Sequence, residues 1–574
     1  MKNWSFHSFL PLVMLLLSPV LRAQEAPVYP TFFGQGVFLG ETLPLRDLPT
    51  LTDAEWTEMK ERAEYKRLNP KLRYRSYPFA STALPQGPDP VWQNSMGNTE
   101  NASSTIQVFE GQSSPYYPPD CNGTAGPNHF LQTINTVYAI YSKTGTLLAG
   151  PTNLNTVFSG VTGAGCNDGD PIVLYDEQAD RWLFTAFSIC GSNDYMLVAV
   201  STTNDPTGTW YKYSFDVADM PDYPKFGIWQ DGYYLGTNTT PGNDIYVMER
   251  SVILAGGTNP KMVGFDNPWR PTTIDGFMCV PPVDNDGAFA PAGSPGLFIT
   301  INDDAIGGGA DQLWIYELTV NWSNTAASTF QRVQQLDVAP FDSNFGNTWN
   351  NIPQQGTSQK LDAIPMVVMN VPQYRNFGTF QTLVCCHTVD VDATNHAGIR
   401  WYELRKSGTS WTVRQHGTYA PDAQSRWMGS ISMNGANEIA LGYSISSSSL
   451  YPGIRYTGQT QGSYNSANGL LDIPEETLHT GTNSQSGANR WGDYSQMSVD
   501  PADDETFWFT TQYIGTGGSR RTKIASLQIG PIAPSASFTA STTLPCLNQT
   551  VTFTDQSTGR DRKSTRLNSS HESP

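Results

Sequence analysis

Four carboxylates stand just before apolar stretches of the chain, where a strand would hold each of them at its start. They are Asp170, Asp222, Asp362 and Asp493. Glycoside hydrolysis needs two carboxyl groups roughly 5–9.5 Å apart, with different roles in proton transfer. If the strands that follow these residues meet around one axis, the four carboxylates are candidates for such a pair.

Two pairs of an arginine and a tryptophan form the second set of candidates. Arg426-Trp427 recurs as Arg490-Trp491, and a methionine follows each pair at the same spacing. A guanidinium group matches the geometry of a carboxylate, and an indole ring offers a flat apolar face to a sugar or a protein partner. The alternative is that each arginine stacks on an aromatic ring of a neighbouring repeat, so that the pairs act as cement.

Both sets are expected at one end of a central channel, because their residues directly precede innermost strands. The predicted ligand-binding rim comprises Asp170, Asp222, Arg426, Trp427, Arg490, Trp491 and Asp493. No catalytic residue is assigned among them.

Two oxygen-rich loops have the composition of a calcium site. The loops 120–123 and 167–170 offer carboxylate and amide oxygens, although neither completes the twelve-residue EF-hand pattern. Ordinary turns use the same residues. The histidines lack the mutual spacing of metal ligands, and the seven cysteines contain no Cys-x-x-Cys pair. Calcium is therefore the one cofactor left open, and no metal ligand is assigned.

The best-marked enzyme motifs are absent from the sequence. Gly-x-Ser-x-Gly, His-Glu-x-x-His, the phosphate-binding loop and the dinucleotide fingerprint do not occur. Two acidic turns, 176–180 and 500–504, resemble sialidase Asp-boxes but lack their Ser-x-Asp-x-Gly core. Our interpretation is that each aspartate caps its own turn.

Composition and internal repetition predict the fold. Only 15% of the residues are charged and 12% are aromatic, which suits many short strands joined by turns. Tyr316-Glu317-Leu318 recurs as Tyr402-Glu403-Leu404, and the Arg-Trp segments recur as well. Such repeats indicate an all-β protein with a β-propeller of about seven blades over residues 103–530. Two packed β-sandwiches are the alternative.

The N-terminal part has the features of export. Residues 1–23 contain a basic start, an apolar run and a small residue before Gln24, which predicts a secretory signal peptide. No later segment is apolar enough to span a membrane. The net charge of −18 disfavours nucleic acid as a partner. The protein is thus expected to be secreted, extracellular or on the outer surface.

Residues 24–102 are expected to form a preamble outside the blades. Thr52 and Glu55 have the spacing of a capping box, which predicts one short helix over about 53–67. The proline-rich run 77–92 indicates an extended linker laid over the next domain.

The C-terminal part contains two further segments. Residues 531–560 resemble the first half of a PKD domain, an immunoglobulin-like β-sandwich, through the pattern from Phe553 to Gly559. The chain as a whole resembles exported multidomain surface proteins of the Bacteroidetes type, which carry such modules and often a sorting domain. Residues 561–574 resemble a translated sequencing adapter, and we leave them out of the fold prediction.

On these grounds we favour a non-enzymatic binding or adhesion protein. Its propeller would present a rigid loop face to an extracellular glycan or protein, with PKD modules as spacers. A glycan-active hydrolase of the sialidase or glycoside hydrolase type is the alternative, and a structural surface-layer component is the third reading. The fold alone does not decide among them, and the oligomeric state is left open.

The genomic sequence is expected to differ from this chain after about residue 560. Half a β-sandwich leaves its core open to water, so a natural PKD module needs further strands. Sequencing of the chromosomal locus should replace the adapter-like segment by the remainder of a domain. A genomic read that continues unchanged through His571 would contradict this prediction.

Overall fold

The computed structural model describes residues 25–68, 88–98, 103–161, 164–189, 193–217, 219–239, 242–273, 277–346, 350–530, 538–541 and 552–555. Strands contain far more of these residues than helices do, so the predicted all-β class is confirmed. The expected signal peptide 1–23, most of the linker 77–92 and the adapter-like segment 561–574 lie outside the described residues.

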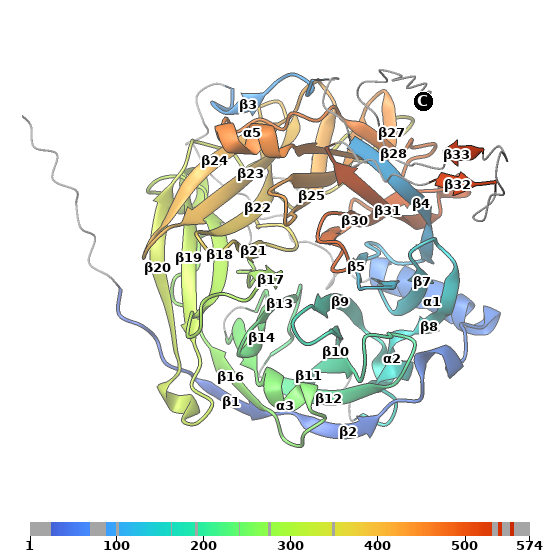
Figure 1. The fold of residues 1–574 in the computed structure, drawn as a ribbon, viewed down its shortest axis with the longest axis vertical. Coiled ribbons are helices and arrows are strands. Elements are labelled where there is room, and N and C mark those ends of the chain that lie inside the picture. The colour runs from blue at the N-terminus through green and yellow to red at the C-terminus, as the bar shows by residue number, and fades with distance from the viewer. Residues whose placement is uncertain are drawn as a thin grey trace, which may run out of the picture.

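Seven of the eight sheets in the described residues surround a central axis, as Figure 1 shows. Sheet 1 consists of β5 (Asn122–Ala125), β6 (His129–Ile134), β7 (Val137–Ser142) and β8 (Leu147–Asn153). Sheet 2 consists of β9 (Gly169–Asp176), β10 (Arg181–Ser188), β11 (Asp194–Ser201), β12 (Trp210–Val217) and β2 (Val37–Glu41). Sheet 3 consists of β13 (Lys225–Trp229), β14 (Gly232–Gly236), β15 (Ile245–Met248), β16 (Lys261–Phe265) and β1 (Phe32–Gln35).

The later sheets follow in chain order around the ring. Sheet 4 consists of β18 (Gly296–Asn302), β19 (Gln312–Thr319) and β20 (Thr329–Asp337). Sheet 5 consists of β17 (Asp284–Asp286), β21 (Gln373–Asn376), β22 (Gln381–Asp390), β23 (Ala397–Lys406), β24 (Trp411–Tyr419) and β3 (Trp92–Gln93). Sheet 6 consists of β25 (Ser425–Met433), β26 (Ile439–Ser447), β27 (Leu450–Gln459) and β28 (Glu476–His479). Sheet 7 consists of β29 (Gln496–Val499), β30 (Phe507–Ile514), β31 (Arg520–Ile529) and β4 (Ser103–Ser114).

This radial arrangement of sheets is a β-propeller, and the alternative of two packed sandwiches is wrong. The two innermost strands form the hairpins β9–β10, β13–β14, β25–β26 and β29–β30 in sheets 2, 3, 6 and 7. In sheet 1 the hairpin β6–β7 lies one strand further out, because the short strand β5 occupies the innermost place.

Helices in the described residues are few and mostly short. They are α1 (Asp53–Leu68), α2 (Leu154–Val157), α3 (Arg250–Leu254), α4 (Asp304–Gly307) and α5 (Gln461–Ser466), with 3-10 turns at Leu45–Asp47, Ala164–Cys166, Thr325–Ala327 and Thr516–Gly518. The predicted capping box of α1 is confirmed: Thr52 N–H donates to Glu55 at 2.8 Å, and Glu55 N–H donates to the Thr52 hydroxyl at 3.2 Å. None of these helices is both long and apolar enough to cross a membrane.

The segment before the propeller is more than a preamble. Strands β1, β2 and β3 pair with the outer strands β16, β12 and β24, and Val28 bridges to Phe330 of β20. Outer strands carry unpaired N–H and C=O groups, and covering them removes a site of uncontrolled strand pairing. Strands β1, β2 and β3 and the bridge at Val28 therefore cover the outside of four sheets, which the sequence patterns did not predict.

The ring closes where β4 pairs with β31. Their antiparallel register runs from Ser103 opposite Ile529 to Ser114 opposite Arg520. The chain then continues from β4 directly into sheet 1, so sheet 7 contains strands from both ends of the ring (Figure 1). The first and last sheets are thereby joined by main-chain hydrogen bonds.

Side chains satisfy the backbone of the innermost strands. An inner strand has no partner on its channel side, and a buried N–H group without an acceptor is costly. Asn122 accepts the N–H of Val173 at 2.7 Å, and Asp284 accepts that of Ile228 at 2.7 Å. The first bond joins sheets 1 and 2, and the second joins sheets 3 and 5. The bonds from Met433 N–H to Gln373 and from Met497 N–H to Ser430 join sheets 6 and 5 and sheets 7 and 6.

The acidic turns do cap themselves, as predicted, and they also tie sheets together. Asp176 accepts the N–H of Ala179 at 3.1 Å, and Asp500 accepts that of Ala502 at 2.9 Å. Asp176 is also ion-paired with Arg250 of sheet 3, and Asp500 with Lys143 of sheet 1. Each turn thus anchors a basic side chain of the following sheet.

Beyond the ring, two short strands are described in the region that resembles a PKD domain. Strand β32 (Phe538–Ala540) pairs antiparallel with β33 (Phe553–Asp555). This hairpin forms the eighth sheet.

Trp427 and Trp491 pack against each other between sheets 6 and 7. Both are fully buried, their ring centroids lie 5.6 Å apart, and the Trp491 indole N–H donates to the Ser444 hydroxyl at 3.1 Å. Large buried aromatic side chains contribute much of the packing energy between layers. The repeated tryptophan therefore acts as cement, which was the alternative reading of the Arg-Trp pairs.

Trp491→Ala is expected to destabilise the fold by roughly 3–5 kcal/mol, because it leaves a cavity and an unpaired serine hydroxyl between the two sheets. Denaturant unfolding of the purified chain measures this loss. Tyr29→Ala is the control, since that ring is 59% exposed and its removal should change stability little. Equal stabilities for the two variants would contradict the packing role of Trp491.

Candidate functional site

Several inner strands begin next to a residue in the left-handed backbone conformation. The φ angles of Asp120, Asp170, Tyr223 and Asp493 are 48°, 45°, 52° and 56°. Aspartate tolerates this conformation because its short polar side chain bonds locally, whereas tyrosine adopts it rarely. The side chains around these positions interact across the ring, and we call the group the channel mouth. It consists of Asp120, Asp170, Asp222, Tyr223, Lys225, Arg490, Asp493 and Tyr494.

Asp120 and Asp170 form a carboxyl pair in the channel mouth. The two carboxyl groups lie close enough to interact, and the neighbouring Asp170 contributes to the raised pKa of Asp120. Asn135 donates its amide N–H to Asp120, and the Tyr494 hydroxyl donates to Asp170 at 3.2 Å. Burial, with the charges of Asp170 and Asp493, raises the pKa of Asp120 well above its ordinary value. The pair thus retains a proton at pH values where exposed aspartates are ionised.

An ion pair lies beside the carboxyl pair. Arg490 donates to the Asp493 carboxylate, and the Tyr223 hydroxyl donates to the Asp493 carbonyl at 3.2 Å. Burial raises the pKa of Asp493, while Arg490 and Lys225 oppose that effect. Asp222 accepts the amide N–H of Asn238 at 2.8 Å, and burial raises its pKa too. The mouth therefore combines a protonated carboxyl with a carboxylate that has a cationic partner.

Lys225 is the least expected member of the channel mouth. Its ammonium nitrogen lies 3.3 Å from the centre of the Tyr223 ring and 3.5 Å from that of Tyr494. The side chain is fully buried, and its nitrogen finds no hydrogen-bond acceptor among the described residues. Burial lowers the pKa of Lys225 to about 7, against the attraction of the neighbouring acids. Near neutral pH its charge is thus held mainly by the faces of two aromatic rings.

The structure brings together four of the seven residues predicted for the ligand-binding rim. Asp170, Asp222, Arg490 and Asp493 lie in the channel mouth. The fourth carboxylate candidate, Asp362, is fully buried and accepts the N–H of Ile364 at 2.9 Å.

The other three predicted rim residues are wrong. Trp427 and Trp491 are fully buried between sheets and offer no face to a ligand. Arg426 is also fully buried, and it is ion-paired with Asp422 at 2.8 Å and with Glu475 at 2.7 Å. Its guanidinium group is saturated by these carboxylates and is not available to a substrate.

The sequence analysis missed the tyrosines and the lysine of the mouth. Tyr223 and Lys225 flank a proline at the start of β13, and Tyr494 follows Asp493 before β29. The repeated placement of Asp-Pro at 170–171, Tyr-Pro at 223–224 and Asp-Tyr at 493–494 just before inner strands is the signal that was available. It marks equivalent turns but does not reveal which side chains meet.

A polar layer lies below the mouth, between the inner strands. Gln496 accepts the side-chain N–H groups of Asn122 and Asn370, the latter at 3.3 Å. All three side chains are nearly fully buried. The three amide groups thus satisfy one another in the buried centre of the ring.

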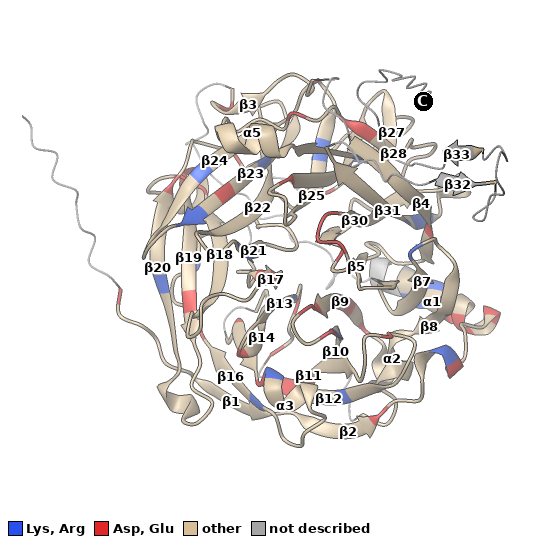
Figure 2. Cartoon of the chain, in the orientation of Figure 1, with Lys and Arg blue, Asp and Glu red and all other residues tan. Residues whose placement is uncertain are grey.

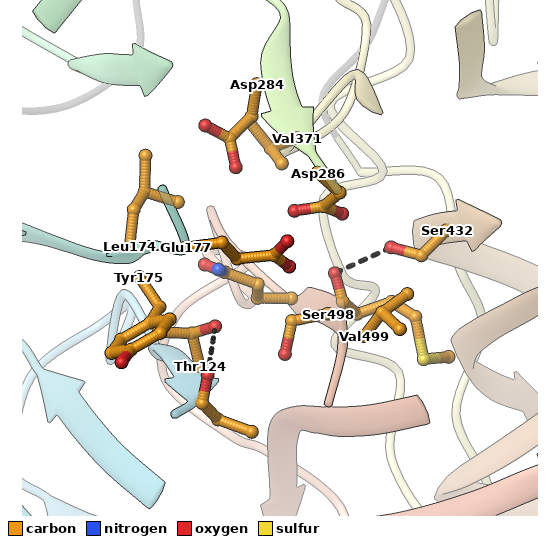
Figure 3. A pocket seen from close by; sticks show the side chains of 13 residues that line it. Thr124, Leu174, Tyr175, Glu177, Asp284, Asp286, Val371, Ser432, Ser498 and Val499 are labelled. Atoms are coloured by element: carbon orange, nitrogen blue, oxygen red, sulfur yellow. Dashed lines mark hydrogen bonds between the residues drawn. The ribbon is translucent and has the colours of Figure 1, made fainter. Parts of the chain in front are cut away.

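The opposite end of the channel contains an acidic chamber, which Figure 3 shows from close by. Glu177, Asp284 and Asp286 line it together with Ser432 and Ser498, and the carboxyl groups of Glu177 and Asp286 are directed toward each other. Acidic segments gather near the centre of the ring in Figure 2 as well, at β9 and β17. The chamber has a volume of about 10 Å³, room for about one water molecule. A sugar ring does not fit there.

Burial controls the charge of this acidic chamber. It raises the pKa of Glu177 to about 8, with a further contribution from the charge of Asp286. Asp286 accepts an amide N–H from Gln373, and Asp284 is engaged by Ile228 N–H. Asp284 and Asp286 thus act as hydrogen-bond acceptors between the inner strands.

In the two loops considered for calcium, the carboxylates interact with other residues of the protein. Asp120 is paired with Asp170, and Asp168 is ion-paired with Arg62 at 2.5 Å and accepts the N–H of Ile189 at 2.8 Å. One group in the described residues, Asp303, Asp304 and Asp311, has carboxylate oxygens close enough to share an ion. Asp303 and Asp311 already accept backbone N–H groups of Ser343 and Phe341. Calcium therefore gains no support at either predicted loop.

Comparisons with known proteins give no family. No protein-family model and no curated protein matches the chain. Similar solved structures include a protein of unknown function from Dyadobacter fermentans (12% identity, 74% of this chain and 99% of that chain, TM-score 0.32). They also include an α-L-arabinanase from Penicillium chrysogenum (9%, 62% and 92%, 0.26) and an exo-β-1,3-galactanase from Phanerochaete chrysosporium (11%, 74% and 99%, 0.27). These likenesses are distant, and the propeller assignment rests on the sheets of this chain itself.

Lys225→Met is expected to stabilise the protein by a few kcal/mol near pH 7, because it removes a buried amine that ionises there. Between about pH 7 and about pH 10 the unfolded wild-type chain binds more protons at Lys225 than the folded one. The stability of the wild type should therefore rise with pH over this range, and its deficit relative to the variant should shrink. Denaturant unfolding at several pH values measures both, with exposed Lys360→Met as control. A gap independent of pH would contradict the lowered pKa.

Proposed function

We propose that the protein is a glycan-active hydrolase whose reaction takes place at the channel mouth. The observation that carries this proposal is the carboxyl pair of Asp120 and Asp170 next to the ion pair of Arg490 and Asp493. Hydrolysis of a glycosidic bond needs a carboxyl group that donates a proton and a second one that stays ionised. The mouth supplies both kinds within one cluster.

The proposal assigns roles according to the surroundings of each group. Asp120 is the general acid, because burial and the neighbouring acids raise its pKa well above the ordinary value and so favour its protonated form. Asp170 exchanges that proton with it. Asp493 acts in its carboxylate form, which the ion pair with Arg490 favours against the effect of burial, as the base or nucleophile on the sugar. Asp222, held by Asn238, adds negative charge that stabilises a developing oxocarbenium ion.

A binding platform is the second candidate function, as the sequence analysis favoured. Its support is the burial of Asp120, Tyr223, Lys225 and Tyr494, which leaves Asp170, Asp222 and Arg490 as the more accessible members of the mouth. An extracellular glycan or protein would then rest on the mouth without being cleaved. Turnover distinguishes the two candidates.

We further propose that each of the seven sheets of the ring is one blade of the propeller. Residues 531–560 would begin a PKD module that acts as a spacer, and residues 561–574 would be adapter-derived. Export as a secreted or surface protein is supported by the composition of residues 1–23 and by the disulfide of Cys166, since disulfides persist in oxidising compartments.

The purified full chain is expected to release reducing sugar from at least one polymer in a panel of arabinan, β-1,3-galactan, sialylated glycans and uronate-containing glycans. Asp120→Asn should lower this activity at least 100-fold at an unchanged melting temperature, because the asparagine keeps the shape of the protonated carboxyl but cannot donate its proton. Asp216→Asn is the control, since this exposed carboxylate lies on outer strand β12.

Two results would overturn the proposal. Full activity of Asp120→Asn would remove the general acid from the mouth. Binding of a glycan without release of product, lost on Arg490→Ala at an unchanged melting temperature, would instead support the binding platform.

A further inference from the structure

A cavity of about 270 Å³ lies outside the channel, between α1 and the closing strands of the ring. Its lining comes from α1, from the end of β4 and the segment after it, and from the start of β31. The lining residues are Trp56, Lys60, Ser113, Ser114, Pro115, Tyr117, Ser519 and Arg520. It is somewhat smaller than the roughly 300–1,000 Å³ pockets that enclose drug-sized ligands. One sugar ring with its substituents is the size of ligand that it suits.

Aromatic rings and cations alternate around this cavity. Trp56 and Lys60 stand one helical turn apart on α1, with the ammonium group 5.5 Å from the indole centre. The guanidinium group of Arg520 lies 3.5 Å from the centre of the Tyr117 ring and donates to the Pro115 carbonyl at 2.7 Å. These contacts hold each cation over one face of its aromatic ring.

The charge of the lining is opposite to that of the chain. Two basic side chains and three serines line the cavity and no acidic one does, although the whole chain carries a net charge of −18. A flat apolar face, hydroxyl groups and fixed positive charge together suit a ring that carries both hydroxyls and an anionic group. An inorganic anion would use the cations but leave the aromatic faces unoccupied.

We propose that this cavity binds an acidic sugar residue, one whose ring stacks on Trp56 or Tyr117 and whose carboxylate is held by Arg520 and Lys60. The segment from Pro115 to Asp120 leads from the cavity into the channel mouth along the chain. This inference rests on the proposed function and specifies its substrate class. The substrate would be a glycan that contains uronic or other carboxylated sugars.

The test is direct binding, which does not depend on turnover. Saturation-transfer NMR of the full chain with glucuronic acid should give signals from the sugar ring, whereas glucose should bind at least 10-fold more weakly because it lacks the carboxylate. Trp56→Ala and Arg520→Gln should each weaken binding about 10-fold or more. Arg521→Gln is the matched control, since this neighbouring arginine is exposed and does not line the cavity. Melting temperatures of all variants show whether Arg520→Gln loses the fold instead of the ligand.

Three outcomes would overturn the inference. Equal binding of glucose and glucuronic acid would remove the role of the cations. Competition by inorganic phosphate with no effect of Trp56→Ala would reduce the cavity to a simple anion site. Undiminished binding by both variants would place the sugar elsewhere. Asp120→Asn should bind glucuronic acid like the wild type, so failure of the proposed hydrolysis and failure of this site are distinguishable.

Discussion

The unpaired channel edge of each inner strand is the constraint on which the rest of this structure depends. An N–H group at that edge is buried and needs an acceptor, and the chain supplies one from another sheet. Asn122, Asp284, Gln373 and Ser430 each accept such an N–H group. Because every one of these bonds joins two different sheets, the same contacts satisfy the backbone and hold the sheets together around the centre.

The same constraint shapes the chemistry at the two ends of the channel. Between the two ends, Gln496 accepts hydrogen bonds from the buried amide groups of Asn122 and Asn370. The carboxyl groups of Asp120 and Glu177 are buried as well, and burial leads the causes that raise their pKa. The raised pKa of Asp120 at the mouth thus follows from its burial near the centre of the propeller.

Sequence patterns predicted the order of helices and strands better than they predicted the contacts between side chains. Alternation and repetition marked the inner strands, and the capping box located α1 correctly, because these signals are local. The Arg-Trp pairs were misread since a repeat predicts equivalence of position, not exposure: Trp427 and Trp491 meet each other. The surroundings of Lys225 could not be predicted because one of its two aromatic partners, Tyr494, lies far along the chain. The outer strands β1 and β2 escaped notice because they pair with partners far along the chain.

The pairing of β4 with β31 also determines when the ring can exist. As the chain is synthesised or exported from its N-terminus, β4 emerges early but its partner strand is complete only at Ile529. Until then the first sheet lacks a neighbour on one side, and the circular set of contacts between sheets stays open. Everything after Gly530 follows the last strand of the ring in sequence, so modules can be gained or lost there during evolution without removing a strand of the seven sheets.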